Sequence, residues 1–391
     1  MRLMTNQFQK ERLSSIREAR GLTMRHLARH MQLTVASVQA WESGKSQPLK
    51  ENILKLSNIL NVPFMYFYRD LNETNRIESS IFFRSKASAS LTQKKMARRR
   101  IEWLLELIDI ITEYFTLPEI KIFESFESRR YDYTPNEIEN LAIQARRVMG
   151  ISGDGPIENI TTLCESAGII VSHFMIANSL DGFSLIGNTT HEKRPFILVD
   201  TIKDSPGRIR FSVAHELGHL ILHRELKDNF SIEKQHKEIE IQANQFASAF
   251  LMPENTFRER AHFYGTNLED LIQLKREWRV SLMAIIRRLS DLKIISQNYE
   301  IRLYKKLSYH GYRKREPGDD FIPFERPSLF NFVFESMIEN GDDPAKIFLD
   351  RMKIPGSDLD DLIGMEYFSK QKIESHFSKV VPLSFLQRNS D

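Results

Sequence analysis

A pair of histidines one helical turn apart is the feature that most constrains this chain. The run from Arg208 to Arg224, RIRFSVAHELGHLILHR, places His215 and His219 four residues apart among apolar residues. On a helix this spacing puts both imidazoles on one face, where they can reach one cation at about 2.0–2.1 Å. Glu216 lies close enough to take a proton from a water molecule held at that cation. This HExxH pattern predicts a helix with two metal ligands and a general base.

His223 continues the same helical face. Eight residues of straight helix would separate it from His215 by about 12 Å along the axis, which is too far to share an ion. The longer zinc motif that uses a third histidine inserts a glycine turn, and this run has none. We therefore expect His223 to be a helix-end residue favoured by the helix dipole. The third ligand must come from another element.

The segment from Glu238 to Pro253 is predicted to supply that ligand. It reads as an amphipathic helix with an apolar side formed by Ala243, Phe246, Ala247, Phe250 and Leu251. Glu240 lies one turn before Ala243 and Asn244, so it would face the first helix. Glu238 or Glu233 would take its place if the helical register differs.

The positive charge of the chain is concentrated at its start. The 391 residues carry a net charge of +3, but residues 1–70 contain 11 Lys and Arg against five Asp and Glu, an excess of 6, which leaves −3 for the rest. Net charge therefore excludes neither a nucleic-acid binder nor an enzyme. The length exceeds the usual single-domain size and predicts two or three packed units.

The sequence also indicates a cellular location. A single cysteine, Cys164, excludes an internal disulfide framework, fits a reducing cytosol and is expected in the core. The N-terminal residues are charged, and Glu106 and Asp109 interrupt the apolar stretch 104–111. Neither a signal peptide nor a transmembrane span is expected. We expect a cytoplasmic protein without a membrane partner.

The first sixty residues contain the helix-starting and helix-ending residues expected of a compact helical bundle. Two glycines can end helices, Gly21 and Gly44, and two threonines can cap them, Thr23 and Thr34. The expected helices are 8–20, 24–31, 35–42 and 51–60. Two short helices joined by a tight turn make a helix-turn-helix, whose second helix fits the major groove of DNA.

The stretch from Arg12 to Val62, with WESGKSQP after the second helix, resembles the lambda-repressor-like (XRE) helix-turn-helix family. The resemblance implies DNA binding. It places five residues at the base-facing positions: Val35, Ala36, Ser37, Gln39 and Ala40. It places Val38 and Trp41 in the core. The candidates for phosphate contacts are Arg25, Arg29, Lys45 and Lys50.

This stretch departs from the XRE pattern in two ways. Gln32 occupies the turn position at which the family favours glycine. If the turn keeps its left-handed backbone conformation there, the side chain would cost about 1 kcal/mol of stability. Only Ser37 and Gln39, among the base-facing positions, have side chains that hydrogen-bond base edges. A protein-interaction or dimerisation module is therefore the alternative to DNA binding.

The expected fold class is α+β and mostly helical. Residues 1–70 form the bundle, and residues 71–134 form a connector with one long amphipathic helix that ends before Pro118. The basic run Lys94–Arg100 opens this helix and is expected to be a solvated face rather than a DNA contact. Residues 135–260 are expected to combine helices at 136–148 and 160–167 with apolar strands at 168–174, 182–186 and 195–200.

Residues 261–391 are expected to be mainly helical, with a turn-rich stretch at 310–320. No motif here indicates a chemical role, so a sensor or partner-binding function is left open. The charged residues Lys314, Asp319, Asp320 and Arg326 are expected at the surface. The aromatic residues Phe321, Phe324, Phe330, Phe332 and Phe334 are expected in the core.

The segments RFSVAHELGHLILH and EIQANQFASAFLMP resemble the ImmA/IrrE family of bacterial and phage metallopeptidases. The preceding strands and the tail REPGDDFIPFERPSLF extend the resemblance to the XRE-linked branch of that family. It implies a cytosolic zinc peptidase of zincin-like fold joined to a DNA-binding domain. By the same resemblance His215, His219 and Glu240 bind Zn²⁺ and Glu216 is the catalytic base.

Two functions follow from these features. One is a regulator that binds operator DNA as a homodimer and cleaves or inactivates a specific partner, such as a repressor or cognate toxin encoded nearby, in stress response, mobile-element control or toxin–antitoxin regulation. Its substrate would add along the edge strand at Gly182–Leu185. Candidates for the oxyanion stabiliser are Arg208, Arg210, His310 and Tyr312. The alternative is a non-catalytic repressor or antitoxin whose metal domain only senses a ligand or binds a partner.

Overall fold

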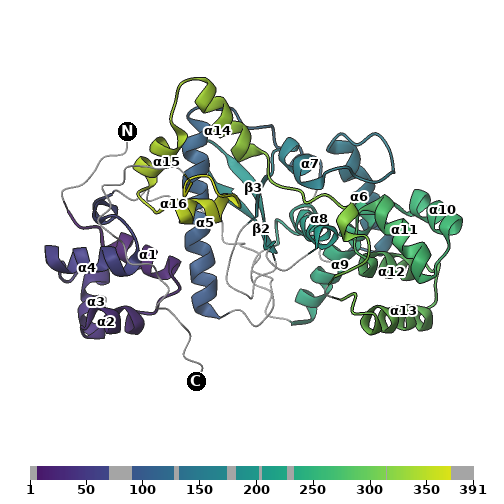
Figure 1. The fold of residues 1–391 in the computed structure, drawn as a ribbon, viewed down its shortest axis with the longest axis horizontal. Helices are drawn as coiled ribbons and strands as arrows, with labels where there is room; N and C mark the ends of the chain where they lie inside the picture. Colours follow the sequence, from purple (N-terminus) through teal and green to yellow (C-terminus); the bar gives the residue numbers. More distant parts are fainter. Residues whose placement is uncertain are drawn as a thin grey trace. The chain divides into compact units, whose positions relative to one another are not determined.

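The chain forms two compact units in a computed structural model that describes residues 7–69, 90–126, 132–173, 182–201, 205–226, 233–313 and 315–370. Unit 1 comprises Met1–Asn75, Ala89–Glu113 and Phe334–Asp391, and unit 2 comprises Arg76–Ser88 and Tyr114–Val333. The chain therefore leaves unit 1 after one long helix and returns to it near its C-terminal end (Figure 1).

Unit 1 begins with the expected bundle. Its elements are α1 (Lys10–Ala19), α2 (Met24–Met31), α3 (Val35–Ser43), α4 (Lys50–Leu60) and the 3-10 helix η1 (Phe64–Tyr68). Thr23 and Thr34 cap α2 and α3 through their side chains, and Gly44 ends α3 with φ +77°. Gln32 has φ +57°, so the left-handed turn is kept despite the side chain. The sequence-based prediction of this bundle is confirmed.

Ion pairs inside unit 1 use much of its positive charge. Arg17 donates two hydrogen bonds to Glu42, at 2.5 and 2.8 Å, and so ties α1 to α3. Arg20 pairs with Asp358 at 2.6 Å, and Arg69 pairs with Glu106. The exposed cations at the expected DNA-facing positions are Arg25, Arg29, Lys45 and Lys50.

The long helix α5 (Leu91–Thr112) exists as predicted, but its expected one-sided amphipathic character is wrong. Every residue from Trp103 to Ile111 is buried, including Glu106 and Asp109. The reason is that α1 packs against it together with two C-terminal helices, α15 (Pro344–Met352) and α16 (Gly356–Ile363). The predicted connector is thus a central helix of unit 1 (Figure 1).

The basic run at the start of α5 is partly ion-paired rather than simply solvated. Lys95 and Arg99 contact Glu18 of α1 at 3.1 and 2.9 Å. Burial would lower the pKa of Arg99, but its pairing with Glu102 and Glu18 more than offsets this and raises it. Two members of the run therefore hold α5 to α1.

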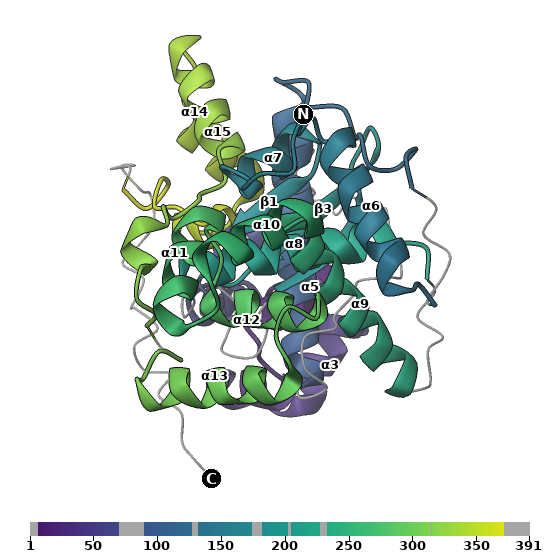
Figure 2. The same cartoon turned by 90° about the vertical axis from the view of Figure 1, so that its right-hand side faces the viewer.

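Unit 2 is an α+β unit with a three-stranded sheet, which confirms the expected fold class. Its strands are β1 (Ile170–His173), β2 (Gly182–Asn188) and β3 (Lys193–Val199), in the order β1-β3-β2, with β1 parallel and β2 antiparallel to β3. Its helices are α6 (Pro135–Val148), α7 (Ile160–Ser166), α8 (Pro206–Leu222), α9 (Glu233–Leu251), α10 (Glu254–Tyr264), α11 (Leu268–Trp278), α12 (Leu282–Asp291) and α13 (Gln297–Tyr309). Figure 2 shows α8 among these helices.

The segment between α13 and α14 (Leu329–Glu339) differs from the expectation of surface charges and core aromatics. Asp319 and the buried Glu316 each lie 2.6 Å from Nζ of the fully buried Lys275, so Asp319 is not a simple surface charge. Lys314 lies outside the described residues. Phe330 and Phe334 are buried as expected, but three others are exposed: Phe321, Phe324 and Phe332. The Arg276 guanidinium covers the Phe321 ring at 4.3 Å.

Among the described residues, no helix has the length and apolar character needed to cross a membrane.

Candidate metal centre and DNA-facing helix

Helices α8 and α9 pack closely because α8 carries a glycine at the contact. A Cβ on Gly218 would lie 3.1 Å from Phe246 Cδ1 and 3.3 Å from the Ala243 carbonyl oxygen, both on α9. Gly207 likewise allows the first turn of α8 to approach Ser281. Gly218 therefore allows α8 to pack against α9, and Gly207 allows it to pack against the start of α12.

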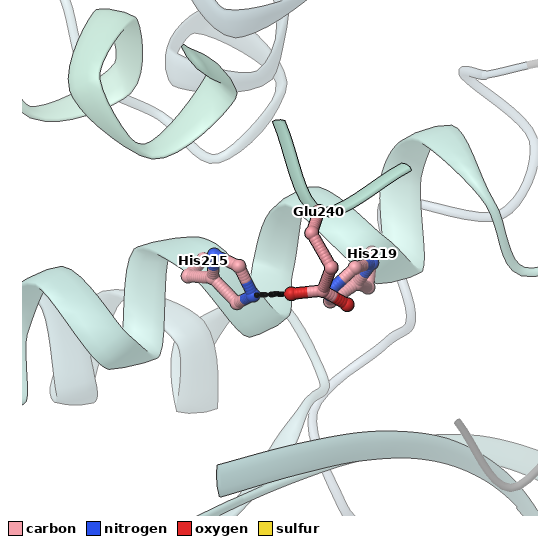
Figure 3. A group of neighbouring side chains, drawn as sticks. All are labelled: His215, His219 and Glu240. Atoms are coloured by element: carbon pink, nitrogen blue, oxygen red, sulfur yellow. Dashed lines mark hydrogen bonds and ion pairs between the residues drawn. The ribbon is translucent and has the colours of Figure 1, made fainter. Parts of the chain in front are cut away.

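Three side chains converge between these helices. The His215 and His219 Nε2 atoms are 3.0 Å apart, and each lies 3.4 Å from a different carboxylate oxygen of Glu240 (Figure 3). The helical register therefore brings Glu240 to the two histidines, whereas Glu238 is exposed on α9 and is not one of the three. The Glu233 side chain lies outside what the structure describes.

The donor set fits a zinc ion. Tetrahedral Zn²⁺ with ligands at about 2.0–2.1 Å places neighbouring ligand atoms roughly 3.3 Å apart, close to the 3.0–3.4 Å observed. The Nδ1 atom of His215 lies 3.0 Å from Asn244 Oδ1, so its proton is held there and Nε2 is left to bind a metal. The side chains of His215 and Glu240 keep 16% and 30% of their surface exposed, which leaves the site accessible.

Glu216 lies beside this cluster and against the sheet. Glu216 is only 6% exposed. A Cβ on Gly182, the first residue of β2, would be 3.3 Å from Glu216 Oε1. The start of β2 therefore passes directly over the carboxylate, and the glycine keeps that approach open.

Two protein families match this chain. The M78 peptidase family described as the IrrE N-terminal-like domain matches residues 164–290, and the helix-turn-helix family matches residues 13–67. The chain joins a helix-turn-helix domain to an IrrE N-terminal-like domain. A search of curated proteins found no match. The predicted fusion is confirmed, and the two domains describe a DNA-binding regulator with a metallopeptidase-like domain; the predicted domain limits at 70, 134 and 260 stay predictions.

The charges of the IrrE N-terminal-like domain favour a metal at the cluster. Burial by itself would raise the pKa of Glu240, but hydrogen bonds from His215 and His219 and their charges hold it well below its usual range. Burial would lower the pKa of His215, but its hydrogen bond to Glu240 and the charges of Glu216 and Glu240 raise it. Both shifts have one cause, which is that the two imidazoles and the carboxylate lie close together.

Zinc affinity is accordingly expected to fall as the pH is lowered. Zinc must displace the His215 proton, and because the pKa of His215 is raised, this competition extends above pH 6.5. Glu240 stays ionised and adds nothing to the dependence. Chelator competition between pH 5.5 and 8.5 measures it, and the expected curve rises with pH and flattens above the raised pKa. An affinity that is the same at pH 6 and pH 8 would contradict the assignment.

His223 lies at the end of α8 and outside the cluster, as expected, but it also contacts two side chains. It is fully buried at the end of α8, its Nδ1 lies 3.2 Å from His219 Nδ1, and its Nε2 lies 3.0 Å from Gln242 Oε1. Sequence reasoning missed the contacts of His223, Gln242 and Asn244. The spacing places His223 one turn after His219 on the same helix, which allows a contact, but the partners of His223 and His215 on α9 leave no signal in the sequence.

Arg210 is one of the four candidates for the oxyanion stabiliser, and its contacts are structural. Its side chain is buried, pairs with Glu325 and donates a hydrogen bond to the Ile157 carbonyl oxygen at 2.6 Å. Arg208 donates to the Arg313 carbonyl oxygen at 2.6 Å. Arg210 therefore holds the segment after α13 to the domain instead of contacting a substrate.

The helix-turn-helix domain presents the predicted base-facing positions to solvent. Val35, Ala36 and Gln39 are exposed on α3, and Ser37 and Ala40 are half-buried, while Val38 and Trp41 are buried as expected. The Ser37 hydroxyl is 2.9 Å from Thr34 Oγ1, within the cap of α3. Of the two hydrogen-bonding side chains at these positions, Gln39 is therefore the exposed one, whereas Ser37 takes part in the helix cap.

Proposed function

We propose that this chain is a DNA-binding transcriptional regulator whose zinc-dependent endopeptidase domain cleaves or inactivates a specific protein partner. The observation that carries the proposal is the cluster of His215, His219 and Glu240 with Glu216 beside it. Structural zinc sites are usually closed by four protein ligands, whereas catalytic sites use three and leave one position open. Within the described residues the cluster has three.

Each residue has a distinct task in peptide hydrolysis. His215, His219 and Glu240 would hold the zinc ion, which when bound polarises a carbonyl group and lowers the pKa of a water molecule. Glu216 takes a proton from the attacking water and later gives it to the leaving amine. The burial of Glu216 among helix and sheet keeps its carboxylate in one place.

The substrate is proposed to bind as an extended strand along β2. This strand is at one edge of the described sheet, and its first residue, Gly182, lies over Glu216. Backbone hydrogen bonds to an edge strand would hold the scissile bond near the carboxylate without demanding one side-chain sequence.

The experiment that tests the peptidase proposal uses the full chain loaded with zinc. Proteins encoded next to its gene are incubated with it, and products are identified by mass spectrometry. We expect one partner to be cut at a defined bond, cleavage to stop with a chelator, and cleavage to return with added zinc. Cleavage that continues at full rate without metal would contradict the proposal.

The DNA-binding part is proposed to recognise an operator as a homodimer through α3. Replacing Gln39 by alanine is expected to cost about 1–3 kcal/mol of discrimination at one base position, because it removes an exposed group that can pair with a base edge.

Replacing Arg29 by alanine should weaken binding to all DNA sequences about equally. It should also reduce the slope of log binding constant against log salt concentration by about 1. Binding titrations at several salt concentrations measure both effects.

Lys305 of unit 2 is the matched control, because it is also an exposed cation. Its replacement by alanine should change neither quantity. If Gln39→Ala had no more effect than Lys305→Ala, the proposed role of α3 would be wrong, and the same outcome for Arg29→Ala would remove the proposed phosphate contact of α2.

A further inference from the structure

A hydrogen-bonded chain runs from the metal cluster into the interior of the domain. It begins at His219, passes through His223 and reaches Gln242 of α9, with contacts of 3.2 and 3.0 Å. His223 is 0% and Gln242 is 1% exposed. The His219 and His223 rings are inclined by 50° with centroids 5.3 Å apart, so the contact is between ring nitrogens rather than stacked faces.

The hydrogen-bonding capacity of each atom determines which residue donates in these two hydrogen bonds. The Gln242 Oε1 atom only accepts, so the His223 Nε2 atom facing it carries a proton. A neutral imidazole has one N–H, which leaves a lone pair on His223 Nδ1. His219 Nδ1 therefore donates to His223, and the lone pair of His219 is on Nε2, the atom that faces His215 and Glu240.

The opposite direction is incompatible with a metal site. If the Gln242 amide donated to His223, then His223 would donate to His219 Nδ1. His219 would then carry its proton on Nε2, where a ligand to a cation needs a lone pair. The order found here is therefore the one that prepares His219 for a metal.

The two histidine ligands are oriented by different means. His215 donates to Asn244, whose side chain belongs to an exposed residue, whereas His219 is held by an entirely buried chain. Asn244 and Gln242 lie on α9, the helix that also carries Glu240. Helix α9 thus places the third ligand and, through His223, also selects the tautomer of the second.

We propose that His223 and Gln242 are positioning residues that fix the tautomer and orientation of His219 and so raise the zinc affinity of the cluster. The inference rests on the proposed zinc site and goes beyond it by assigning a role to two residues that do not contact the ion. Groups that hold a metal-ligating histidine typically change metal affinity by about 10–100-fold when removed.

The test compares two replacements of His223 in the full chain. His223→Leu removes the acceptor for His219 and is expected to lower zinc affinity by about 10–100-fold in chelator competition. His223→Asn places an amide oxygen near the position of Nδ1 and is expected to restore most of that affinity. Leu222→Ala is the control, because it creates a cavity at an equally buried position of the same helical turn, and it should lower thermal stability without changing zinc affinity.

A spectroscopic measurement tests the same point on the unaltered protein. Long-range proton–nitrogen correlation on histidine-labelled, zinc-loaded chain should show His219 protonated on Nδ1 and His223 protonated on Nε2, with the His223 signals identified by their loss in His223→Asn. A His223 proton on Nδ1 would overturn the proposal, even if His223→Leu failed to fold.

The outcomes separate this inference from the zinc site itself. A wild-type chain that binds no zinc would overturn both. Equal zinc affinity in wild type and His223→Leu, or an equal loss in Leu222→Ala, would overturn the positioning role alone and leave the zinc site intact.

Discussion

Replacing Glu216 by glutamine is expected to lower the rate of partner cleavage by about 10²–10⁴-fold, because a positioned general base contributes that much to proton transfer. Zinc affinity should remain close to that of the wild type, since Glu216 is not one of the three clustered side chains. The amide has nearly the same shape, so the contact with Gly182 is retained. Cleavage rates and zinc affinities of the two proteins measure the difference.

Glu238 of α9 supplies the control for this replacement, because it is an exposed glutamate outside the cluster. Glu238→Gln should cleave at the wild-type rate. If Glu216→Gln abolished cleavage but regulated its target genes as well as the wild type, or if no partner were cleaved by the wild type, the enzyme hypothesis would be wrong. A non-catalytic repressor or antitoxin that only senses a ligand or binds a partner would then remain.

Replacing Glu240 by alanine is expected to lower zinc affinity by at least about 100-fold, which is the upper end of the effect of losing a residue that only supports a ligand. Glu240 brings both carboxylate oxygens to the histidine nitrogens, and the ionised group offsets the charge of the cation. Its lowered pKa means that this charge is present throughout the physiological range. Chelator competition measures the loss, and Glu238→Ala, with no predicted effect, is again the control.

Helical spacing predicted that the two histidines share one face, and it favoured Glu240 as their partner while leaving Glu238 and Glu233 open. His215 and His219 share one face of a helix at a spacing of four, and Glu240 was placed by the apolar stripe of α9. Both arguments use only neighbours within one helix. The structure then brings the two faces together through Gly218, whose lack of a side chain permits the close packing.

The supporting residues could not be predicted in the same way. Whether His223 contacts His219 depends on side-chain rotamers and on Gln242, which belongs to another helix. Nothing in the spacing distinguishes such a buried histidine from an exposed one at a helix end. Which acceptor His223 meets depends on how α8 and α9 pack together, and the sequence of neither helix alone determines it.

The surroundings of α5 show a second limit. Its sequence has the spacing of a one-sided helix, with Glu106 and Asp109 as natural candidates for a solvent face. In the structure a segment more than two hundred residues later returns to cover that face, and Arg69 pairs with Glu106. These carboxylates are buried because of long-range contacts, and the local spacing of apolar residues gives no information about such contacts.

The most direct test of the central claim is to locate the metal in crystals of the full chain by anomalous scattering at the zinc edge. The account predicts one zinc ion per chain, bound by His215 Nε2, His219 Nε2 and Glu240, with a fourth position that no protein side chain occupies. Zinc bound elsewhere, or closed in by a fourth protein ligand, would contradict it.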